Sequence, residues 1–223
     1  MASGPWDGPD ERDGWEVART GMMEGMDARR AGPDDLELVA DTLALAFSAD
    51  PAWTWVFHDP GCCTEQLRSV WSLLLRASVR HAWIWTTPGA GAVTQWVPPG
   101  VAELTPAEEL AMGRLVDELL GPEVWRATAL FERFEAARPK APEHYYLSLF
   151  GTRPEARGQG LGMALLADNL ARIDAEGMPA YLESTNPVNL GRYRSVGFVD
   201  AGQFALPDGG PQVTTMWREP RTA

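Results

Sequence analysis

The chain is poor in lysine, cysteine and histidine, and each shortage excludes a class of function. Its 223 residues include a single lysine, Lys140, beside eighteen arginines. Lys140 stands in a proline-rich segment, so a phosphate-binding Gly-Lys-Ser/Thr loop is absent and a Schiff-base lysine is disfavoured. The two cysteines are the neighbours Cys62 and Cys63, and the three histidines lack metal-ligand spacing. The sequence therefore predicts neither a disulfide framework nor a metal site.

Long apolar runs and excess positive charge are also missing. No apolar run approaches the roughly 20 residues that a membrane span needs, and the N-terminus lacks the basic-then-apolar order of a secretory signal. We therefore expect a cytoplasmic protein with no membrane partner. The formal net charge of -12 argues against nucleic acid as a partner. This acidity is compatible with a cationic partner, although solubility alone also accounts for it.

The composition is that of one globular domain. Hydrophobic residues make up 45% of the chain and charged residues 22%, which suffices for a substantial core. Residues 1–21 are rich in Gly, Asp, Pro and Arg without an apolar period, so we expect a disordered leader there. Residues 22–223 then form the domain, because the later connectors are too short to separate a second one. The sequence is also compatible with a homodimer.

The spacing of apolar residues predicts a mixed α+β domain. Asp50-Pro51 ends the first helix, and the tryptophan-rich segment 53–57 after it is expected to be an irregular turn. In the C-terminal third, strands alternate with helices, which implies a mixed sheet with helical crossovers. The expected strands are 24–30, 82–87, 92–97, 144–150, 180–184, 198–205 and 212–218, and the expected helices are 32–47, 67–78, 106–120, 123–137, 160–176 and 187–195.

A glycine-rich loop joins the strand at 144–150 to the helix at 160–176. Its sequence is Arg157-Gly158-Gln159-Gly160-Leu161-Gly162. Alternating glycines remove Cβ atoms where backbone amides converge, and free amides at a helix N-terminus form an anion-binding site. Arg153 adds positive charge, whereas Met163 replaces the third glycine of a dinucleotide-binding loop. From this pattern alone, the loop is either a phosphate site or a flexible turn with close helix–sheet packing.

Two segments resemble the signatures of the GCN5-related N-acetyltransferases (GNAT). Residues 151–162 resemble the family's coenzyme A motif, Gln/Arg-x-x-Gly-x-Gly/Ala, and residues 189–198 are similar to its second signature. The usual Val-x-Pro before the loop is replaced here by Thr152-Arg153-Pro154. The segments more specifically similar to the actinobacterial subgroup that contains puromycin N-acetyltransferase are Asp50-Pro51, residues 138–142 and residues 182–185.

The resemblance implies an α+β GNAT fold, in which helices flank a mixed central β-sheet. It also implies an acyl-CoA-dependent enzyme that transfers acetyl from acetyl-CoA to a small primary amine by direct attack, without a metal. One rival is a non-catalytic coenzyme A-sensing module, which would keep the loop but would not need a catalytic acid or base. Another is a GNAT-fold acyltransferase with a carrier-protein or aminoacyl-tRNA donor. The intact loop glycines disfavour that donor, and the acidity disfavours tRNA.

The resemblance also implies the cofactor contacts. The pantetheine arm of coenzyme A would follow the strand before the loop, where a backbone amide could bind the oxyanion of thioester attack. The pyrophosphate would sit on the amides of the glycine loop. The residues implied in cofactor binding are Leu149, Phe150, Gly151, Arg157, Gly158, Gln159, Gly160, Leu161, Gly162, Met163 and Asn189.

Two side chains are candidates for proton transfer. Tyr193 follows Asn189 by one helical turn, so both face the same way. A tyrosine with a pKa of about 10 holds its proton until a departing thiolate needs it. The alternative for Tyr193 is a packing residue ahead of Phe198. Glu183 interrupts an otherwise apolar strand and could act as the base through water. Its alternative is an acid hydrogen-bonded to backbone at a strand end.

Tryptophan is abundant near the expected turn. Six of the ten tryptophans lie within 53–96. Trp53 and Trp55 follow Asp50 in a segment with no regular face to bury both, and loop aromatics on a rigid scaffold often line a cleft. We therefore expect them to bind an amine with aromatic or apolar bulk, attracted by Asp50 and Asp59. The alternative is a local hydrophobic cluster. Core packing is expected for Trp71, Trp83 and Trp85.

Overall fold

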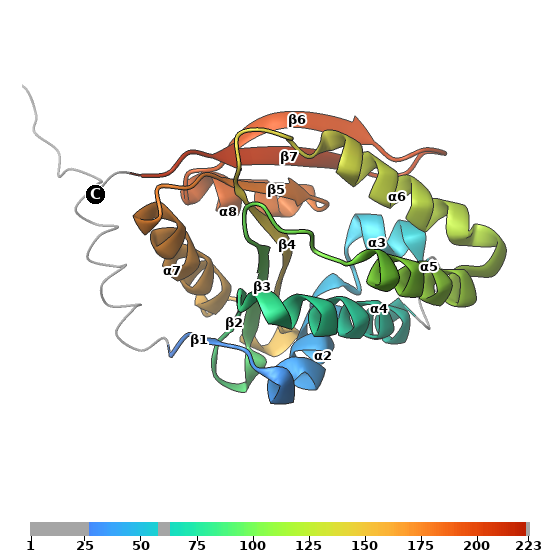
Figure 1. Ribbon diagram of the computed structural model, residues 1–223, viewed down its shortest axis with the longest axis horizontal. Coiled ribbons are helices and arrows are strands. Elements are labelled where there is room, and N and C mark those ends of the chain that lie inside the picture. The colour runs from blue at the N-terminus through green and yellow to red at the C-terminus, as the bar shows by residue number, and fades with distance from the viewer. Residues whose placement is uncertain (1–26, 58–62, 222–223) are drawn as a thin grey trace, which may run out of the picture.

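The computed structural model describes residues 27–57 and 63–221, which form a seven-stranded mixed sheet with helices on both faces (Figure 1). The strand order is β1-β2-β3-β4-β5-β7-β6, in which only β4 and β5 run parallel. The strands are β1 Arg29–Arg30, β2 Ile84–Thr86, β3 Ala92–Val97, β4 Tyr145–Thr152, β5 Ala180–Ser184, β6 Val199–Ala205 and β7 Gln212–Arg218. The predicted α+β class with a mixed sheet is confirmed.

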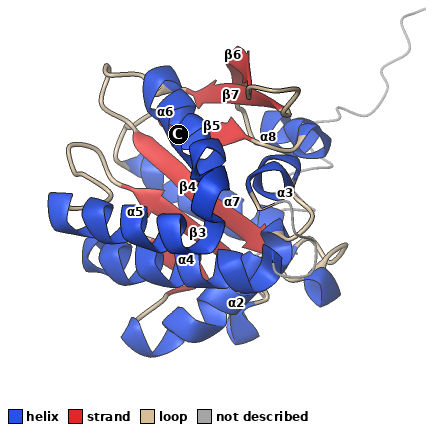
Figure 2. Ribbon diagram, turned by 90° about the vertical axis from the view of Figure 1, so that its right-hand side faces the viewer, coloured by secondary structure: helices blue, strands red, loops and turns tan. Residues whose placement is uncertain are grey.

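The helices form two layers. On one face α2 packs against α4 and the sheet, and α4, α5, α6 and α3 follow one another in contact. On the other face α7 crosses β3 and β4 (Figure 2). No helix among the described residues is long and apolar enough to cross a membrane. The helices are α2 Leu36–Phe47, α3 Pro51–Val56, α4 Cys63–Ser78, α5 Pro106–Leu120, α6 Val124–Ala137, α7 Leu161–Ala175 and α8 Leu190–Ser195.

The sheet separates two apolar clusters, because successive side chains of a strand point to opposite faces. Ile84 belongs to the cluster beneath α2 and α4, whereas its neighbours Trp83 and Trp85 belong to the cluster beneath α7. Trp71 lies in the first cluster. The core roles predicted for these three tryptophans are therefore confirmed.

The segment after Asp50 differs from its prediction. Residues 51–56 form the short helix α3 rather than an irregular turn. The Asp50 carboxylate caps this helix by accepting from the backbone N–H of Ala52 at 3.0 Å and of Trp53 at 3.4 Å. Pro51 at the first helical position has no N–H to leave unpaired. A proline that ends one helix can thus begin the next. The expected leader, residues 1–21, lies outside the described residues.

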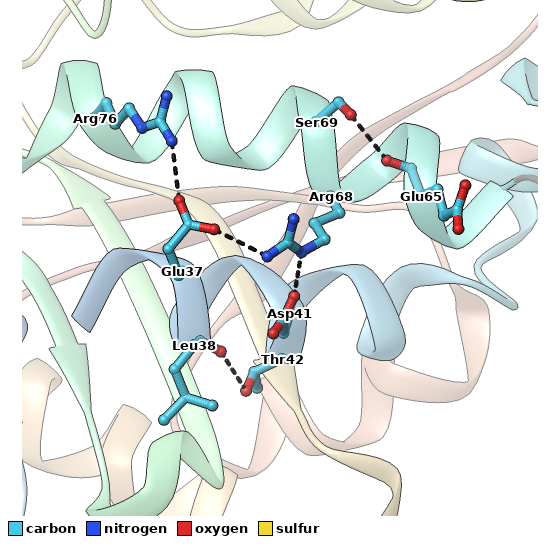
Figure 3. A network of polar contacts seen from close by, with 8 residues as sticks. All are labelled: Glu37, Leu38, Asp41, Thr42, Glu65, Arg68, Ser69 and Arg76. Carbon is cyan, nitrogen blue, oxygen red and sulfur yellow. Dashed lines mark hydrogen bonds and ion pairs between the residues drawn. The ribbon is translucent and has the colours of Figure 1, made fainter. Parts of the chain in front are cut away.

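An ion-pair network joins the exposed sides of α2 and α4 (Figure 3). Arg68 pairs with both Glu37 and Asp41, and Arg76 pairs with the other carboxylate oxygen of Glu37 at 2.9 Å. These side chains are exposed, so each pair contributes little to the free energy of folding. Apolar burial beneath the network contributes more. The fully buried side chains at this interface include Val39, Leu43, Leu67 and Val70.

Candidate active site

A cavity lies where the two parallel strands separate. β4 and β5 pair only at Tyr145 with Ala180 and Tyr146 with Tyr181, although both strands continue beyond these residues. Residues of the helices α2, α3, α6 and α8 line the space between the two strands. Its lining residues are Phe47, Asp50, Trp53, Phe134, Tyr146, Leu147, Ser148, Leu149, Phe150, Leu182, Glu183, Ser184, Thr185, Asn189 and Tyr193.

β4 carries a bulge at the cavity wall. Opposite β3, Leu147 pairs with Trp96 and Leu149 pairs with Gln95, so Ser148 is an extra residue. The bulge changes the face of every later side chain: Leu147 packs in the cluster under α7, whereas Leu149 packs in the cluster under α2. A bulge leaves its extra residue outside the ladder of hydrogen bonds. A peptide group of β4 is therefore available beside the cavity.

The glycine loop has the geometry of an anion-binding turn. Gly158 and Gly160 have φ values of 80° and 77°, a left-handed conformation that side chains disfavour, and Gly160 is the N-cap of α7. The first N–H groups of a helix have no intrahelical acceptor. In the described chain, no amide from Gly158 to Met163 donates to a turn or cap hydrogen bond. These amides are therefore available to an anion.

Two other glycines of the motif allow close packing. A Cβ on Gly151 would lie 2.7 Å from the Cβ of Ala46, so this residue lets α2 approach β4. A Cβ on Gly162 would overlap Thr152 and touch the Phe150 ring, so this residue lets α7 approach the same strand. Close helix–sheet packing thus accounts for Gly151 and Gly162, whereas a phosphate site at Gly158 and Gly160 stays a prediction.

The two arginines of the loop differ in their partners. Arg157 is exposed and donates to the carbonyl oxygens of Ala46 at 3.3 Å and Thr152 at 3.4 Å. Because these acceptors are neutral, its positive charge remains beside the loop. Arg153 lies 3.8 Å from the carboxylate of Glu155, which offsets part of its charge. Arg157 is thus the better-placed cation for an anion.

Asn189 and Tyr193 both line the cavity, which agrees with the expectation from their spacing that they face the same way. The Tyr193 ring packs edge-on against Phe150 and Phe198, with centroids 6.3 and 6.1 Å apart. Burial, reinforced by the charge of Asp50, raises the pKa of Tyr193 well above its usual value. The phenol is therefore protonated at neutral pH. Packing and proton donation are compatible roles for this residue.

Glu183 is a buried acid at the cavity wall. Its carboxylate oxygen Oε1 is buried without a hydrogen-bond partner among the described residues. Burial raises the pKa of Glu183 to about 7, against the opposing effects of Arg138, Tyr146 and Tyr181. Among the described residues, no backbone N–H donates to this carboxylate, so the alternative of a strand-end acid hydrogen-bonded to backbone is not observed. The group can therefore take up a proton near neutral pH.

Of the residues predicted to bind the amine substrate, some line the cavity and others do not. Asp50 and Trp53 line the cavity, and Asp50 also accepts from the Thr185 hydroxyl at 2.8 Å. Trp53 packs on Trp71, with ring centroids 4.7 Å apart. Trp55 is not among the lining residues. It lies edge-on to Trp125 at 5.7 Å, with the Arg126 guanidinium 5.1 Å from its ring. Asp59 lies outside the described residues.

Several cavity residues had no sequence signal. Phe47 and Phe134 come from helices far apart in the chain, Tyr146 and Ser148 come from β4, and Thr185 directly follows β5. Each fits the ordinary pattern of its own element, so only their convergence identifies them. Within the described residues, no cluster of three or more His, Cys, Asp or Glu could hold a metal ion.

Comparison with known proteins supports the fold and the class of enzyme. No family model matches the chain. It is similar to a Corynebacterium glutamicum protein described as histone acetyltransferase HPA2 and related acetyltransferase, with a TM-score of 0.63 and 26% identity over 89% of this chain and 98% of that one. A Drosophila melanogaster polyamine N-acetyltransferase matches with a TM-score of 0.59 and 16% identity over 87% and 99% of the two chains.

An arylalkylamine N-acetyltransferase 2 from Aedes aegypti matches with a TM-score of 0.58 and 11% identity over 88% of this chain and 100% of that one. The two insect proteins share only the fold, because their identities are low. The chain therefore has the fold of the GNAT acetyltransferases. On its similarity to the Corynebacterium glutamicum protein, it is an enzyme of the acyltransferase class.

Proposed function

We propose that the protein transfers an acetyl group from acetyl-CoA to the primary amine of a small molecule by direct attack. One observation carries the proposal: a protonated phenol, Tyr193, and an acid with a pKa of about 7, Glu183, line the same cavity between β4 and β5. A coenzyme A-sensing module would need neither group. The more specific likeness to the puromycin N-acetyltransferase subgroup is part of this proposal.

The residues around the cavity fit the chemistry of acetyl-CoA. The free amides from Gly158 to Met163, the N-terminus of α7 and the charge of Arg157 suit a pyrophosphate. The backbone from Leu149 to Gly151 would bind the pantetheine arm. When bound, acetyl-CoA supplies the thioester carbonyl. Asn189 lines the same wall and would contact the cofactor.

Glu183 and Tyr193 carry out the proton transfers. Glu183 takes a proton from the acceptor ammonium, directly or through water, so that the neutral amine can attack the thioester carbon. The amides beside the bulge at Ser148 bind the oxyanion. The N–C bond forms first, and as the C–S bond then breaks, Tyr193 gives its proton to the departing sulfur. The second proton of the attacking nitrogen passes to the resulting Tyr193 phenolate, directly or through water, and Glu183 releases its proton to solvent.

The acceptor side of the cavity favours an amine with aromatic or apolar bulk. Three aromatic residues, Phe47, Trp53 and Phe134, line it together with the acids Asp50 and Glu183. A ring gains from apolar burial and edge-to-face contact on such a wall, while the acids attract the ammonium. Arylalkylamines and polyamines, the substrates in the names of the two insect proteins, are the classes to compare.

The proposed function is tested by mass spectrometry of products formed from acetyl-CoA and a panel of primary amines. We expect an N-acetylated product from the wild type. Gly160→Asp places a negative charge at the anion site and should weaken acetyl-CoA binding at least about tenfold, since an anion at a helix N-terminus gains up to about 2 kcal/mol. Calorimetry measures this affinity.

The matched control for Gly160→Asp is Gly177→Asp, at the other end of α7. Like Gly160, Gly177 has a positive φ, so the backbone strain and the charge change are similar, and a Cβ on Gly177 would meet no atom within 4 Å. It should bind acetyl-CoA like the wild type. Equal affinities in the two folded variants would remove the loop from the cofactor site. The absence of any acetylated amine would overturn the function.

The two tryptophans of α3 are expected to respond differently to substitution. Trp55 packs on Trp125 outside the cavity lining, so Trp55→Ala should lower the free energy of unfolding by about 3 kcal/mol and leave the acceptor KM unchanged. Trp53 lines the cavity, so Trp53→Phe should raise the acceptor KM with little change in acetyl-CoA affinity. Thermal melts and steady-state kinetics separate these effects. A raised acceptor KM for Trp55→Ala at wild-type stability would instead place Trp55 in the site.

A further inference from the structure

A polar cluster lies beside Glu183 on the sheet face opposite α7. Gln95, Tyr146 and Glu183 stand on the neighbouring strands β3, β4 and β5, each next to residues that pack under α7, so all three point to the other face. Tyr181 shares this face, and Arg138 reaches it from the end of α6. The side chains therefore come together from four elements.

Four buried polar atoms of this cluster have no hydrogen-bond partner among the described residues. They are Gln95 Oε1, Arg138 Nε, the Tyr181 hydroxyl and Glu183 Oε1, and the last two still interact, since the Tyr181 hydroxyl lowers the pKa of Glu183. Buried polar groups are normally paired, so such a concentration needs a reason. A purely structural cluster would gain stability by pairing them. Polar atoms without hydrogen-bond partners beside a cavity can form hydrogen bonds with water or substrate during a reaction.

Arg138 occupies a specific place in the cluster. Its Cζ lies 3.9 Å from the centroid of the Tyr146 ring, and the Tyr146 and Tyr181 rings are 6.0 Å apart. Its only ion pair in the described chain is a long one, 4.0 Å from Glu135. The guanidinium is therefore held by stacking rather than by a direct salt bridge to Glu183. Its charge acts on that carboxylate without direct contact, as the mutual effect of the two groups on their pKa values indicates.

The charges of the cluster support an interaction between Arg138 and Glu183. Burial alone lowers the pKa of Arg138, but Tyr146, Glu183 and Glu103 raise it overall. In the other direction, Arg138 counteracts the rise that burial causes in the pKa of Glu183, while Glu103 adds to that rise. Gln95, which is neutral, donates to Glu103 at 3.0 Å.

Other titratable groups also lie around the cluster. Glu135 is 4.0 Å from the Arg138 guanidinium, and the His144 ring lies 5.6 Å from the Tyr181 ring. Asp50 and Tyr193 line the same cavity as Glu183. The charged groups of the cluster that change the pKa of Glu183 are Arg138 and Glu103.

We propose that Arg138 is a positioning residue for Glu183: its guanidinium, stacked on the Tyr146 ring, keeps the Glu183 carboxylate ionised so that it can accept the proton of the acceptor ammonium. This inference rests on the proposed role of Glu183 as the base. It assigns a function to a residue in the connector between α6 and β4, outside the cavity lining.

The test compares the pH dependence of kcat/KM for the wild type, Arg138→Gln and Arg138→Lys. An opposite charge nearby lowers the pKa of an acid, so its removal raises that pKa. Arg138→Gln should therefore move the acid limb of the profile upward by about one pH unit, while Arg138→Lys keeps it near the wild-type position. On a Glu183→Gln background, Arg138→Gln should change the profile no further, because the two residues act together.

A melting curve accompanies each variant, and loss of stability alone would lower the amplitude of the profile without moving its limb. An unchanged acid limb in folded Arg138→Gln overturns the inference, as does an equal shift on the Glu183→Gln background. A second readout is independent of acetyl transfer. Infrared titration, with Glu183→Gln as the difference reference, reports the protonation of the Glu183 carboxyl directly.

The midpoint of the infrared titration should move to higher pH in Arg138→Gln and stay near the wild-type value in Arg138→Lys. If no amine is acetylated but the signal moves, the proposed function fails and the Arg138–Glu183 interaction stands without its catalytic role. If acetylation occurs and the signal does not move, the inference alone is overturned.

Discussion

Tyr193→Phe is expected to lower turnover by about 10²- to 10⁴-fold, the usual contribution of a general acid or base, while acetyl-CoA affinity stays nearly constant. The substitution removes one oxygen and keeps the ring that packs against Phe150 and Phe198. The departing thiolate then loses its proton donor. Because burial raises the pKa of Tyr193, the wild-type phenol remains protonated, and we expect no loss of this acid between neutral and mildly alkaline pH.

Single-turnover kinetics and calorimetry measure the chemical step and the affinity separately. The matched control is Tyr145→Phe, which removes a hydroxyl that donates to Glu176 at 2.6 Å and does not line the cavity. This control should keep its turnover. A Tyr193→Phe variant whose turnover stays within about twofold of the wild type would make Tyr193 a packing residue, with water protonating the thiolate.

Glu183→Gln is expected to produce the second large effect, a loss of turnover of about 10²- to 10⁴-fold at neutral pH. The base must be ionised to accept a proton, and burial raises its pKa to about 7. Wild-type kcat/KM should therefore rise with pH through about 7, and the Gln variant should lack this limb. Kinetics with an amine whose own ionisation is known separate the limb of the enzyme from that of the substrate.

Glu183→Gln should raise the stability of the protein although it lowers turnover. The pKa of Glu183 is about 7 in the folded protein against an ordinary value of 4.5, so the folded state favours the protonated acid. This contribution is fully present below pH 4.5 and is lost as pH rises through 7. Glu183→Gln avoids burying the charge, so it should melt above the wild type at pH 8, and the difference should shrink toward pH 4.5.

Chemical denaturation at several pH values measures this difference. Glu143→Gln is the matched control, because Glu143 is exposed, and its stability should follow the wild type. A gap between Glu183→Gln and wild type that does not depend on pH would show that Glu183 ionises in the folded state as it does in the unfolded chain. A gain in stability together with a loss of activity would identify an acid retained for function.

Much of the local structure could be read from the sequence because its determinants are close together in the chain. The helix expected at 106–120 is α5, and it begins with a capping box that Thr105 and Glu108 form within four residues. The first helix, by contrast, was followed by a turn in the prediction, whereas the structure has α3. Asp50 and Pro51 are signals both for a break and for a helix start, and the burial of Trp53 against Trp71 decides between them.

The sequence by itself determined the local chemistry: a glycine loop before a helix at residues 157–162, a phenol one helical turn after Asn189, and an acid at position 183 in an apolar strand. Each depends on residues within a few positions of one another, where helix and strand periods hold. The bulge at Ser148 and the separation of β4 from β5 depend instead on how distant strands and helices pack.

The neighbours of Glu183 were likewise decided only in three dimensions. Arg138 and Phe134 end near this acid because α6 lies over the end of the sheet, and neither carries a local signal. The raised pKa of Glu183 has the same origin, since desolvation is produced by the residues that close the cavity rather than by the acid's neighbours in the chain. The sequence therefore identified candidate reactive groups, and the tertiary structure placed Tyr193 and Glu183 in one cavity, because burial and charge at a site depend on contacts between residues far apart in the chain.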